Sequence, residues 1–288
     1  MSAIDHLSGP ETLGEDEREA VETLLYRLAD DEFVLAERYT EWQVRSPTLE
    51  SDLALSNIAQ DELGHARLWY DLLEDFGYEE ADLIWERDPA AFKHATMVEL
   101  PFETGDWADA VVRSYLYDEA ERLRLEALQD SSYPRIVDRV GKVLGEERYH
   151  REHATNWLER LAGTDDGRDR VQAAVDRLFP HALTLFEPVD PDVEARIDEY
   201  GIRTRSLEAL KDEWLETVVP VLEDQGIEVP VSDDGDTTEV ADTDLPEVRG
   251  RDGSHTDAWF DLFEEFTHTY RELGRDRADR IMPDPDEA

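Results

Sequence analysis

The stretch Gln60-Asp61-Glu62-Leu63-Gly64-His65-Ala66-Arg67 decides how the rest of this chain is interpreted. It lies within residues 49–76, where apolar side chains recur at helical spacing. Glu62 and His65 are three residues apart, so both side chains project from one face of the predicted helix. A carboxylate and an imidazole on one helix face often form half of a metal site. The other half must then come from elsewhere in the chain.

The composition is strongly acidic, because 73 Asp and Glu against 29 Lys and Arg give a formal net charge of −44. Such a surface repels phosphate groups, so neither a nucleic acid nor a membrane is expected as a partner. Dense carboxylates are typical of a high-salt cytoplasm, which makes an acidic residue alone a weak indication of a site. The chain has no cysteine and no long apolar run, so we expect a soluble, cytoplasmic protein without thiolate ligands.

The apolar periodicity predicts an all-α fold. Four long helices are expected over about residues 16–45, 49–76, 106–128 and 134–161. Pro47 and the turn at Ser131–Pro134 break the pattern within each pair of helices. Residues 78–105 are irregular and are interpreted as one long crossover with a short helical piece. Two hairpins joined by a long crossover predict the ferritin-like variant of the four-helix bundle.

Additional C-terminal helices are expected over residues 171–186 and 207–222. Residues 226–253 are acidic and rich in Thr, Gly and Val, which favours a loop or linker. The amphipathic segment at 256–273 carries five aromatic residues, which is typical of a docking face. The predicted organisation is a helical bundle over 16–225, an acidic linker over 226–253 and a C-terminal docking helix over 254–277.

Acidic residues three positions before a histidine must be judged against the abundance of acids. Chance predicts about two such pairs for eight histidines, because roughly a quarter of all residues are acidic. The chain has four of these pairs, Glu62/His65, Glu147/His150, Asp252/His255 and Glu265/His268. Spacing alone is therefore a weak signal. The last two pairs lie at the linker end and on a helix without a partner hairpin, so we expect them to be surface features.

Hairpin geometry separates the first two pairs from the others. In an antiparallel hairpin, residues equidistant from the turn lie at the same level of the bundle. Glu32 and Glu62 are centred on Pro47, and Asp118 and Glu147 are likewise centred on the turn near Pro134. This arrangement matches the general dinuclear carboxylate pattern of helix bundles, with aspartate in one glutamate position. The sequence therefore predicts a dinuclear metal site formed by Glu32, Glu62, His65, Asp118, Glu147 and His150.

Charge and donor type indicate which metal this site binds. Four carboxylates balance two divalent cations, and without them so many buried acids would be strongly unfavourable. Imidazole and carboxylate donors without thiolates favour two iron ions, with manganese as the alternative. The neighbouring acids Glu119, Glu121 and Glu146 offer other registers, and Asp118 and Glu147 are preferred because they repeat the spacing of the first hairpin. The alternative interpretation is a set of acidic helix faces turned toward water.

The carboxylates beside the predicted ligands could also orient the histidines. Asp61 and Asp138 are candidates for this role, because metal-binding histidines usually donate their second ring nitrogen to an acid or a carbonyl.

At these positions the chain resembles a known family, the di-iron subunits of phenylacetyl-CoA epoxidase. The resemblance covers roughly residues 20–225 and rests on Arg45–Leu49, Gln60–His65, Trp107–Asp109 leading to Asp118, and Glu146–His150. In that family the A-type subunit is catalytic and binds the di-iron centre. The C-type subunit is usually a structural partner that has lost most of the ligands.

The chain combines features of both subunit types. Residues 53–59, 149–161 and 253–256 resemble the C-type subunit. The six predicted metal ligands nevertheless fill all of the A-type ligand positions. The chain is therefore identified as a C-type subunit that retains the A-type ligand set, which departs from the usual C-type pattern.

The resemblance implies a subunit of a multicomponent oxygenase that epoxidises the aromatic ring of phenylacetyl-CoA in aerobic phenylacetate catabolism. The implied partners are a homologous catalytic or structural subunit and a separate reductase, since this chain shows no flavin or iron–sulfur motif. One alternative is a non-catalytic scaffold subunit that stabilises the catalytic subunit of the same complex. A ferritin-like oxidase is the other alternative.

Overall fold

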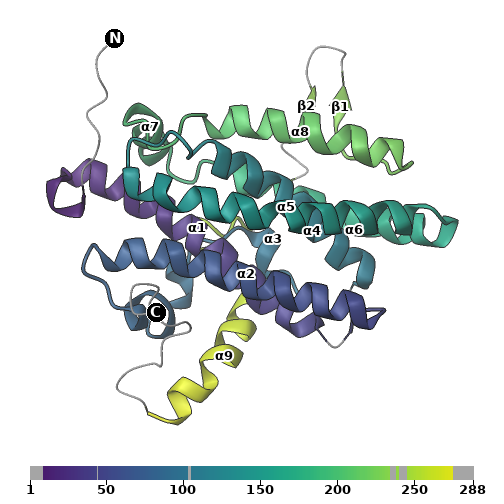
Figure 1. Cartoon of the computed structure of the whole chain (residues 1–288), viewed down its shortest axis with the longest axis horizontal. Coiled ribbons are helices and arrows are strands. Elements are labelled where there is room, and N and C mark those ends of the chain that lie inside the picture. Colours follow the sequence, from purple (N-terminus) through teal and green to yellow (C-terminus); the bar gives the residue numbers. More distant parts are fainter. Residues whose placement is uncertain (1–8, 44, 103–104, 234–237, 240–244, 275–288) are drawn as a thin grey trace.

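The structure is a computed structural model that describes residues 9–43, 45–102, 105–233, 238–239 and 245–274. These residues form an all-α, ferritin-like four-helix bundle with further helices packed on it, which confirms the predicted fold class (Figure 1). The four long helices are α1 (Glu15–Trp42), α2 (Leu49–Glu74), α4 (Trp107–Glu126) and α5 (Pro134–Ala162). α1 packs along α2 and α4 packs along α5, so each pair forms one of the expected hairpins.

The helix starts follow from capping side chains. The Thr48 hydroxyl accepts a hydrogen bond from the backbone N–H of Ser51 (3.1 Å) at the start of α2. Asp106 caps α4 as predicted, by accepting from the N–H of Ala108 (2.7 Å). Pro134 occupies the first position of α5, where its missing N–H is harmless. Thr48 and Pro134 thus mark the ends of the two tight turns and Asp106 marks the end of the crossover, which sets the level of residues deeper in the bundle.

The crossover between the hairpins contains three short helical pieces rather than the single one expected. They are a π-helical turn at Ala81–Trp85, a 3-10 turn at Pro89–Ala91 and α3 (Thr96–Glu99). All four residues of α3 are buried, and α3 packs against α1 and α6 (Asp165–Ala182). The crossover is therefore part of the core, and its polar side chains need buried partners.

The C-terminal helices extend the prediction in one respect. After α6 come a 3-10 turn at Leu183–Phe186, α7 (Pro191–Glu199), α8 (Leu207–Asp224) and α9 (Asp257–Glu272). The sequence did not predict α7, although two start signals are present. Asp190 caps the helix by accepting from the N–H of Asp192 (3.0 Å), and Pro191 occupies the first helical position. Elsewhere, a 3-10 turn forms at Pro10–Thr12, and β1 (Ser232–Asp233) pairs antiparallel with β2 (Thr238–Glu239).

α9 packs on this chain through its aromatic face. Trp259 is fully buried, and its indole N–H donates to the carbonyl of Pro89 (2.9 Å). Phe266 makes an edge contact with Phe33 of α1, with ring centroids 5.3 Å apart. The predicted docking helix thus covers the crossover and α1, while Phe260 is 38% exposed. The division into bundle, linker and docking helix stays a prediction, and its residues 234–237, 240–244 and 275–277 lie outside the described part of the chain.

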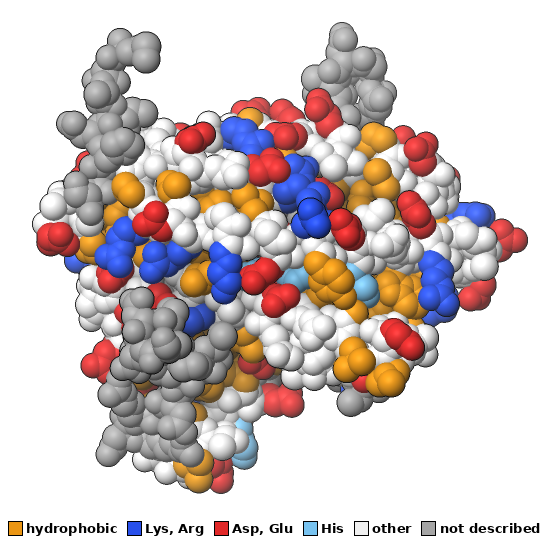
Figure 2. All heavy atoms as spheres, viewed as in Figure 1, with side chains coloured by type: hydrophobic (Ala, Val, Ile, Leu, Met, Phe, Trp, Pro, Cys, Tyr) orange, Lys and Arg blue, Asp and Glu red, His pale blue; other side chains and the backbone are white. Residues whose placement is uncertain are grey.

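On the visible face of the molecule, acids lie among arginines and apolar side chains (Figure 2). Few of the described acids are buried, which agrees with the strongly acidic composition. Among the described residues, no helix is both long enough and apolar enough to span a membrane.

Candidate metal centre

The predicted metal ligands occupy the buried stripe of their helices. Along α5 the stripe is formed by Ile136, Val140, Val143, Glu147, His150, Ala154 and Leu158. Its steps of three and four residues are those of a core-facing helix, yet two of its members are a carboxylate and an imidazole. The other four predicted ligands are equally buried, and none of the six is more than 1% exposed. Acids are almost never buried to this extent without a partner, so a specific interaction must stabilise them.

The two hairpins bring five of the six side chains into close contact. His65 Nδ1 lies 3.6 Å from Glu32 Oε2, 3.7 Å from Glu62 Oε2 and 3.5 Å from Glu147 Oε1. His150 Nδ1 lies 3.5 Å from Glu62 Oε1 and 3.1 Å from Glu147 Oε1. Glu62 and Glu147 each approach both histidines. The donor atoms thus form two overlapping groups that share Glu62, with the atoms of each group within 4.8 Å of one another.

Asp118 lies at the edge of these two groups. It is fully buried, and the Ser114 hydroxyl donates to its Oδ2 (2.7 Å). Burial, followed by the charge of Glu147, raises the pKa of the Asp118 carboxyl well above its usual value. One turn further along α4, Glu121 is also fully buried, and its carboxylate pairs with Arg124 (3.0 Å). α4 therefore presents both Asp118, the preferred ligand of the sequence prediction, and the alternative Glu121 to the bundle interior.

The outer nitrogens of the two histidines bind acids in a reciprocal pattern. His65 Nε2 of α2 lies 2.9 Å from Glu146 Oε2 of α5, and His150 Nε2 of α5 lies 3.3 Å from Asp61 Oδ2 of α2. Each of these acids directly precedes the glutamate of its own Glu-x-x-His pair. The expected contact of Asp61 is confirmed. The expected contact of Asp138 is wrong, because Asp138 is exposed and Glu146 occupies that role.

The buried donors lack ordinary hydrogen-bond partners. Among the described residues, neither carboxylate oxygen of Glu32, Glu62 or Glu147 accepts a hydrogen bond, and Nδ1 of both histidines is likewise unpartnered. Burial and then the charge of Glu62 raise the pKa of Glu32 well above its usual value. Each unsatisfied buried polar group costs about 1–3 kcal/mol. Because all of these atoms face one another, a cation between them would satisfy the whole set, and the donor types fit a transition metal.

The supporting acids also affect the protonation of the histidines. Burial lowers the pKa of the His65 imidazole, but the hydrogen bond to Glu146 and the nearby Glu62 and Glu147 outweigh it and raise that pKa to about 9. A cation bound at Nδ1 would take the place of the proton that these carboxylates favour.

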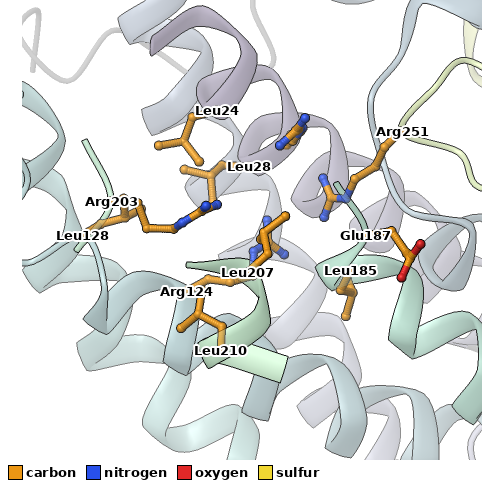
Figure 3. Close-up of a pocket in the computed structure, with 11 residues that line it drawn as sticks. Leu24, Leu28, Arg124, Leu128, Leu185, Glu187, Arg203, Leu207, Leu210 and Arg251 are labelled. Carbon is orange, nitrogen blue, oxygen red and sulfur yellow. The ribbon is translucent and has the colours of Figure 1, made fainter. Parts of the chain in front are cut away.

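Arginines balance the charge on the side of the bundle next to Glu121. A cavity between α1, α4 and the segment before α8 is lined by Arg27, Arg124, Arg203 and Arg251. Figure 3 shows the last three around this cavity. Arg124 and Arg251 both contact Asp31 (2.9 and 2.7 Å), which directly precedes Glu32 on α1. The two remaining arginines share a second buried carboxylate, Glu194 of α7. These ion pairs are buried, so they fix α1 against α4 and the C-terminal segments next to the candidate centre.

The structure also brings together three side chains that no sequence pattern connects. His94 and Glu99 of the crossover meet His255 of the segment before α9, and all three side chains are fully buried. The expectation that His255 is a surface residue is therefore wrong, whereas Asp252, Glu265 and His268 are exposed as expected. No local motif connects His255 with residues so far from it in the sequence.

Comparisons with known proteins agree with this architecture. A family model described as phenylacetic acid catabolic protein matches residues 1–275. The chain is 32% identical over 207 residues to the C subunit of 1,2-phenylacetyl-CoA epoxidase from Escherichia coli (strain K12), a match that covers 71% of this chain and 82% of that protein. The resemblance to the C-type member of the family is thereby confirmed. The chain belongs to the phenylacetic acid catabolic protein family.

Proposed function

We propose that this chain is a subunit of a multicomponent oxygenase that epoxidises the aromatic ring of phenylacetyl-CoA, and that it contains a dinuclear iron centre. The buried set of mutually facing donors carries the proposal, because no other feature of the described residues accounts for so many unsatisfied carboxylates in the core. Family membership and the similarity to the C subunit of an epoxidase support the substrate class.

The proposed ligands are the predicted residues Glu32, Glu62, His65, Asp118, Glu147 and His150, with Glu121 as a further carboxylate within the same interior. When bound, two iron ions would supply the activation of dioxygen that insertion of an oxygen atom into an aromatic ring requires. Manganese is the alternative metal for this donor set.

The protein's own residues prepare the centre in three ways. Glu146 and Asp61 accept from Nε2 of the two histidines, which leaves each Nδ1 free to bind a metal. The Ser114 hydroxyl donates to Asp118 and fixes the orientation of that carboxylate. The apolar stripe of α5 surrounds Glu147 and His150 and keeps bulk water away from the donors.

A scaffold role is the second candidate function, and the similarity to the C subunit, rather than to a catalytic one, specifically favours it. In that case the chain stabilises a homologous catalytic partner, and its own centre binds metal without turning over substrate. Both candidates place the chain in one complex, with electrons supplied by a separate reductase.

Turnover by the chain assembled with its homologous partner separates the two candidates. The assembled complex is reduced chemically, mixed with phenylacetyl-CoA and isotopically labelled oxygen, and assayed for labelled product by mass spectrometry. We expect Glu62→Gln in this chain to abolish labelling, while Glu50→Gln, an exposed change on the same helix, leaves it intact. Undiminished labelling with Glu62→Gln in a correctly assembled complex would assign this chain the scaffold role.

A further inference from the structure

The three side chains of the crossover and the α9 segment form a second group of converging donors. Glu99 Oε2 lies 2.7 Å from His94 Nε2 and 2.8 Å from His255 Nδ1. The two imidazole rings stack, with centroids 4.3 Å apart and planes inclined by 24°. This group lies on the crossover and the segment before α9, so it shares no residue with the candidate dinuclear centre.

The hydrogen bonds of His255 require a cation at its inner nitrogen. Its Nε2 lies 3.1 Å from the carbonyl oxygen of Phe92, which can only accept, so Nε2 must carry the hydrogen. Its Nδ1 faces the Glu99 oxygen, which also accepts when the carboxyl is ionised. A neutral imidazole has a single N–H, so the Nδ1 lone pair would point at an oxygen lone pair. A proton or a metal ion between the two atoms removes this conflict.

The surroundings match those of a histidine that binds a metal. Such histidines commonly donate their second N–H to a backbone carbonyl, as His255 does to Phe92. The carboxylate is oriented in the same way, because the N–H of Thr256 donates to Glu99 Oε1 (2.7 Å) and leaves Oε2 facing the two imidazoles. The supporting contacts for a bound ion are therefore already present at His255 and Glu99, whereas Nδ1 of His94 has no hydrogen-bond partner among the described residues.

The donor types also suit metal binding. One carboxylate and two imidazoles form a donor set that zinc adopts, with a fourth position for water or the second oxygen of Glu99.

The backbone is shaped to bring these donors together. Gly250 has φ +77° and Gly253 has φ +87°, a region that favours glycine. A Cβ at Gly250 would lie 2.3 Å from the carbonyl oxygen of His94, and a Cβ at Gly253 would lie 2.6 Å from that of Ala90. Only glycine lets the segment before α9 approach the crossover this closely.

We propose that His94, Glu99 and His255 bind one divalent metal ion of the zinc class, and that this ion fastens α9 to the crossover. The site joins residues more than 150 positions apart in the chain, because the backbone returns to the crossover only after α8. It is independent of the dinuclear iron proposal, since it uses other residues and performs no redox chemistry.

Anomalous diffraction tests the site directly. Crystals of the full chain, stripped with a chelator and then supplied with zinc alone, are measured on both sides of the zinc absorption edge. We expect an anomalous peak between His94 Nε2, Glu99 Oε2 and His255 Nδ1. This peak should appear whether or not zinc also binds at the dinuclear centre. Zinc-saturated crystals that show a peak at the dinuclear centre but none at this position would overturn the proposal.

Metal analysis of variants gives the second test. His94→Gln is expected to lose one zinc per chain relative to the wild-type chain, while His268→Gln, an exposed change on α9, loses none. Hydrogen exchange of α9 should slow on adding zinc to the wild-type chain and be unaffected by zinc in His94→Gln. Full zinc retention by a folded His94→Gln chain would contradict the proposal; if that variant does not fold, Glu99→Gln and the diffraction experiment decide.

Discussion

Glu146 of α5 reaches across the bundle to the outer nitrogen of His65 on α2, with 2.9 Å between Oε2 and Nε2. The opposite contact, from Asp61 of α2 to His150 of α5, makes the arrangement reciprocal. Both helices therefore carry the same unit, an acid followed by Glu-x-x-His. In each unit the first acid contacts the histidine of the other helix, and the glutamate and histidine face the bundle interior. The two hairpins are thus coupled through the ligands themselves.

Glu146→Gln is expected to weaken metal binding without unfolding the bundle. The amide cannot accept from His65 with the strength of a carboxylate, so the orientation and basicity of that histidine decline. Loss of such a supporting contact lowers metal affinity by roughly 10–100-fold. Competition for ferrous iron against a chelator of known affinity measures the change. Glu152→Gln, an exposed change on the same helix, is the control. Equal iron affinities of the two variants would show that Glu146 does not support metal binding.

Glu37 should make the stability of the protein depend on pH. Burial, and then the charges of Glu265 and Glu41, raise its pKa from 4.5 to about 7. The pKa of the Glu37 carboxyl is higher in the folded state than in the unfolded state. Its contribution to the free energy of unfolding is therefore complete below about pH 4.5 and is lost as pH rises through 7. Glu37→Gln should therefore raise the free energy of unfolding at pH 8 by up to about 3 kcal/mol relative to wild type, and much less at pH 5.

Urea unfolding at the two pH values measures this difference, with Glu216→Gln on the exposed face of α8 as the control. A Glu37→Gln effect that is the same at pH 5 and pH 8 would show that the carboxyl titrates normally.

Comparing Gly250→Ala with Gly77→Ala tests how tightly the segment before α9 packs against the crossover. Both glycines have positive φ, +77° and +97°, so both substitutions incur a backbone strain of about 1–2 kcal/mol. Only at Gly250 would the new Cβ also collide with the carbonyl oxygen of His94, since Gly77 has open space around it. Gly250→Ala should therefore be the more destabilising change in chemical unfolding. Equal losses would mean that the segment before α9 can move away from the crossover at little cost.

Asp31→Asn is expected to destabilise the fold strongly. The carboxylate lies 2.9 Å from Arg124 and 2.7 Å from Arg251, and all three groups are buried. Without Asp31 the buried guanidinium of Arg251 loses its carboxylate, and that of Arg124 keeps only Glu121. Breaking a buried ion pair in this way typically costs about 3–5 kcal/mol. Thermal unfolding at low and high salt measures the loss. Asp165→Asn, which removes an exposed ion pair with Arg168, should change stability by less than about 1 kcal/mol.

The sequence predicted the parts of the fold that depend on local periodicity. The regular rise of a helix places residues equidistant from a turn at one level, and on this basis Glu32 and Glu62 were correctly placed together. The same logic shows why Asp138 fails as a partner of the histidines. It lies eight residues before Glu146 on α5, about 12 Å along the helix axis from the acid that contacts His65. The sequence prediction treats Glu146 only as an alternative ligand.

Contacts distant in sequence could not be predicted in this way. His255 meets Glu99 only because the backbone returns to the crossover after α8, and no local periodicity encodes that return. α7 was missed for a different reason, since its nine residues are too few for a clear apolar repeat, although Asp190 and Pro191 mark its start.

The iron content of the purified chain decides whether the buried carboxylates and histidines form a dinuclear centre. The chain is reconstituted with ferrous iron under reducing, oxygen-free conditions, freed of loosely bound metal and analysed for iron per chain, alongside Glu62→Ala and the surface control Glu50→Gln. We expect two iron ions per chain for the wild-type protein and the control, and a large loss in Glu62→Ala. A folded wild-type chain that binds no iron under these conditions would show that the buried donors do not form an iron centre.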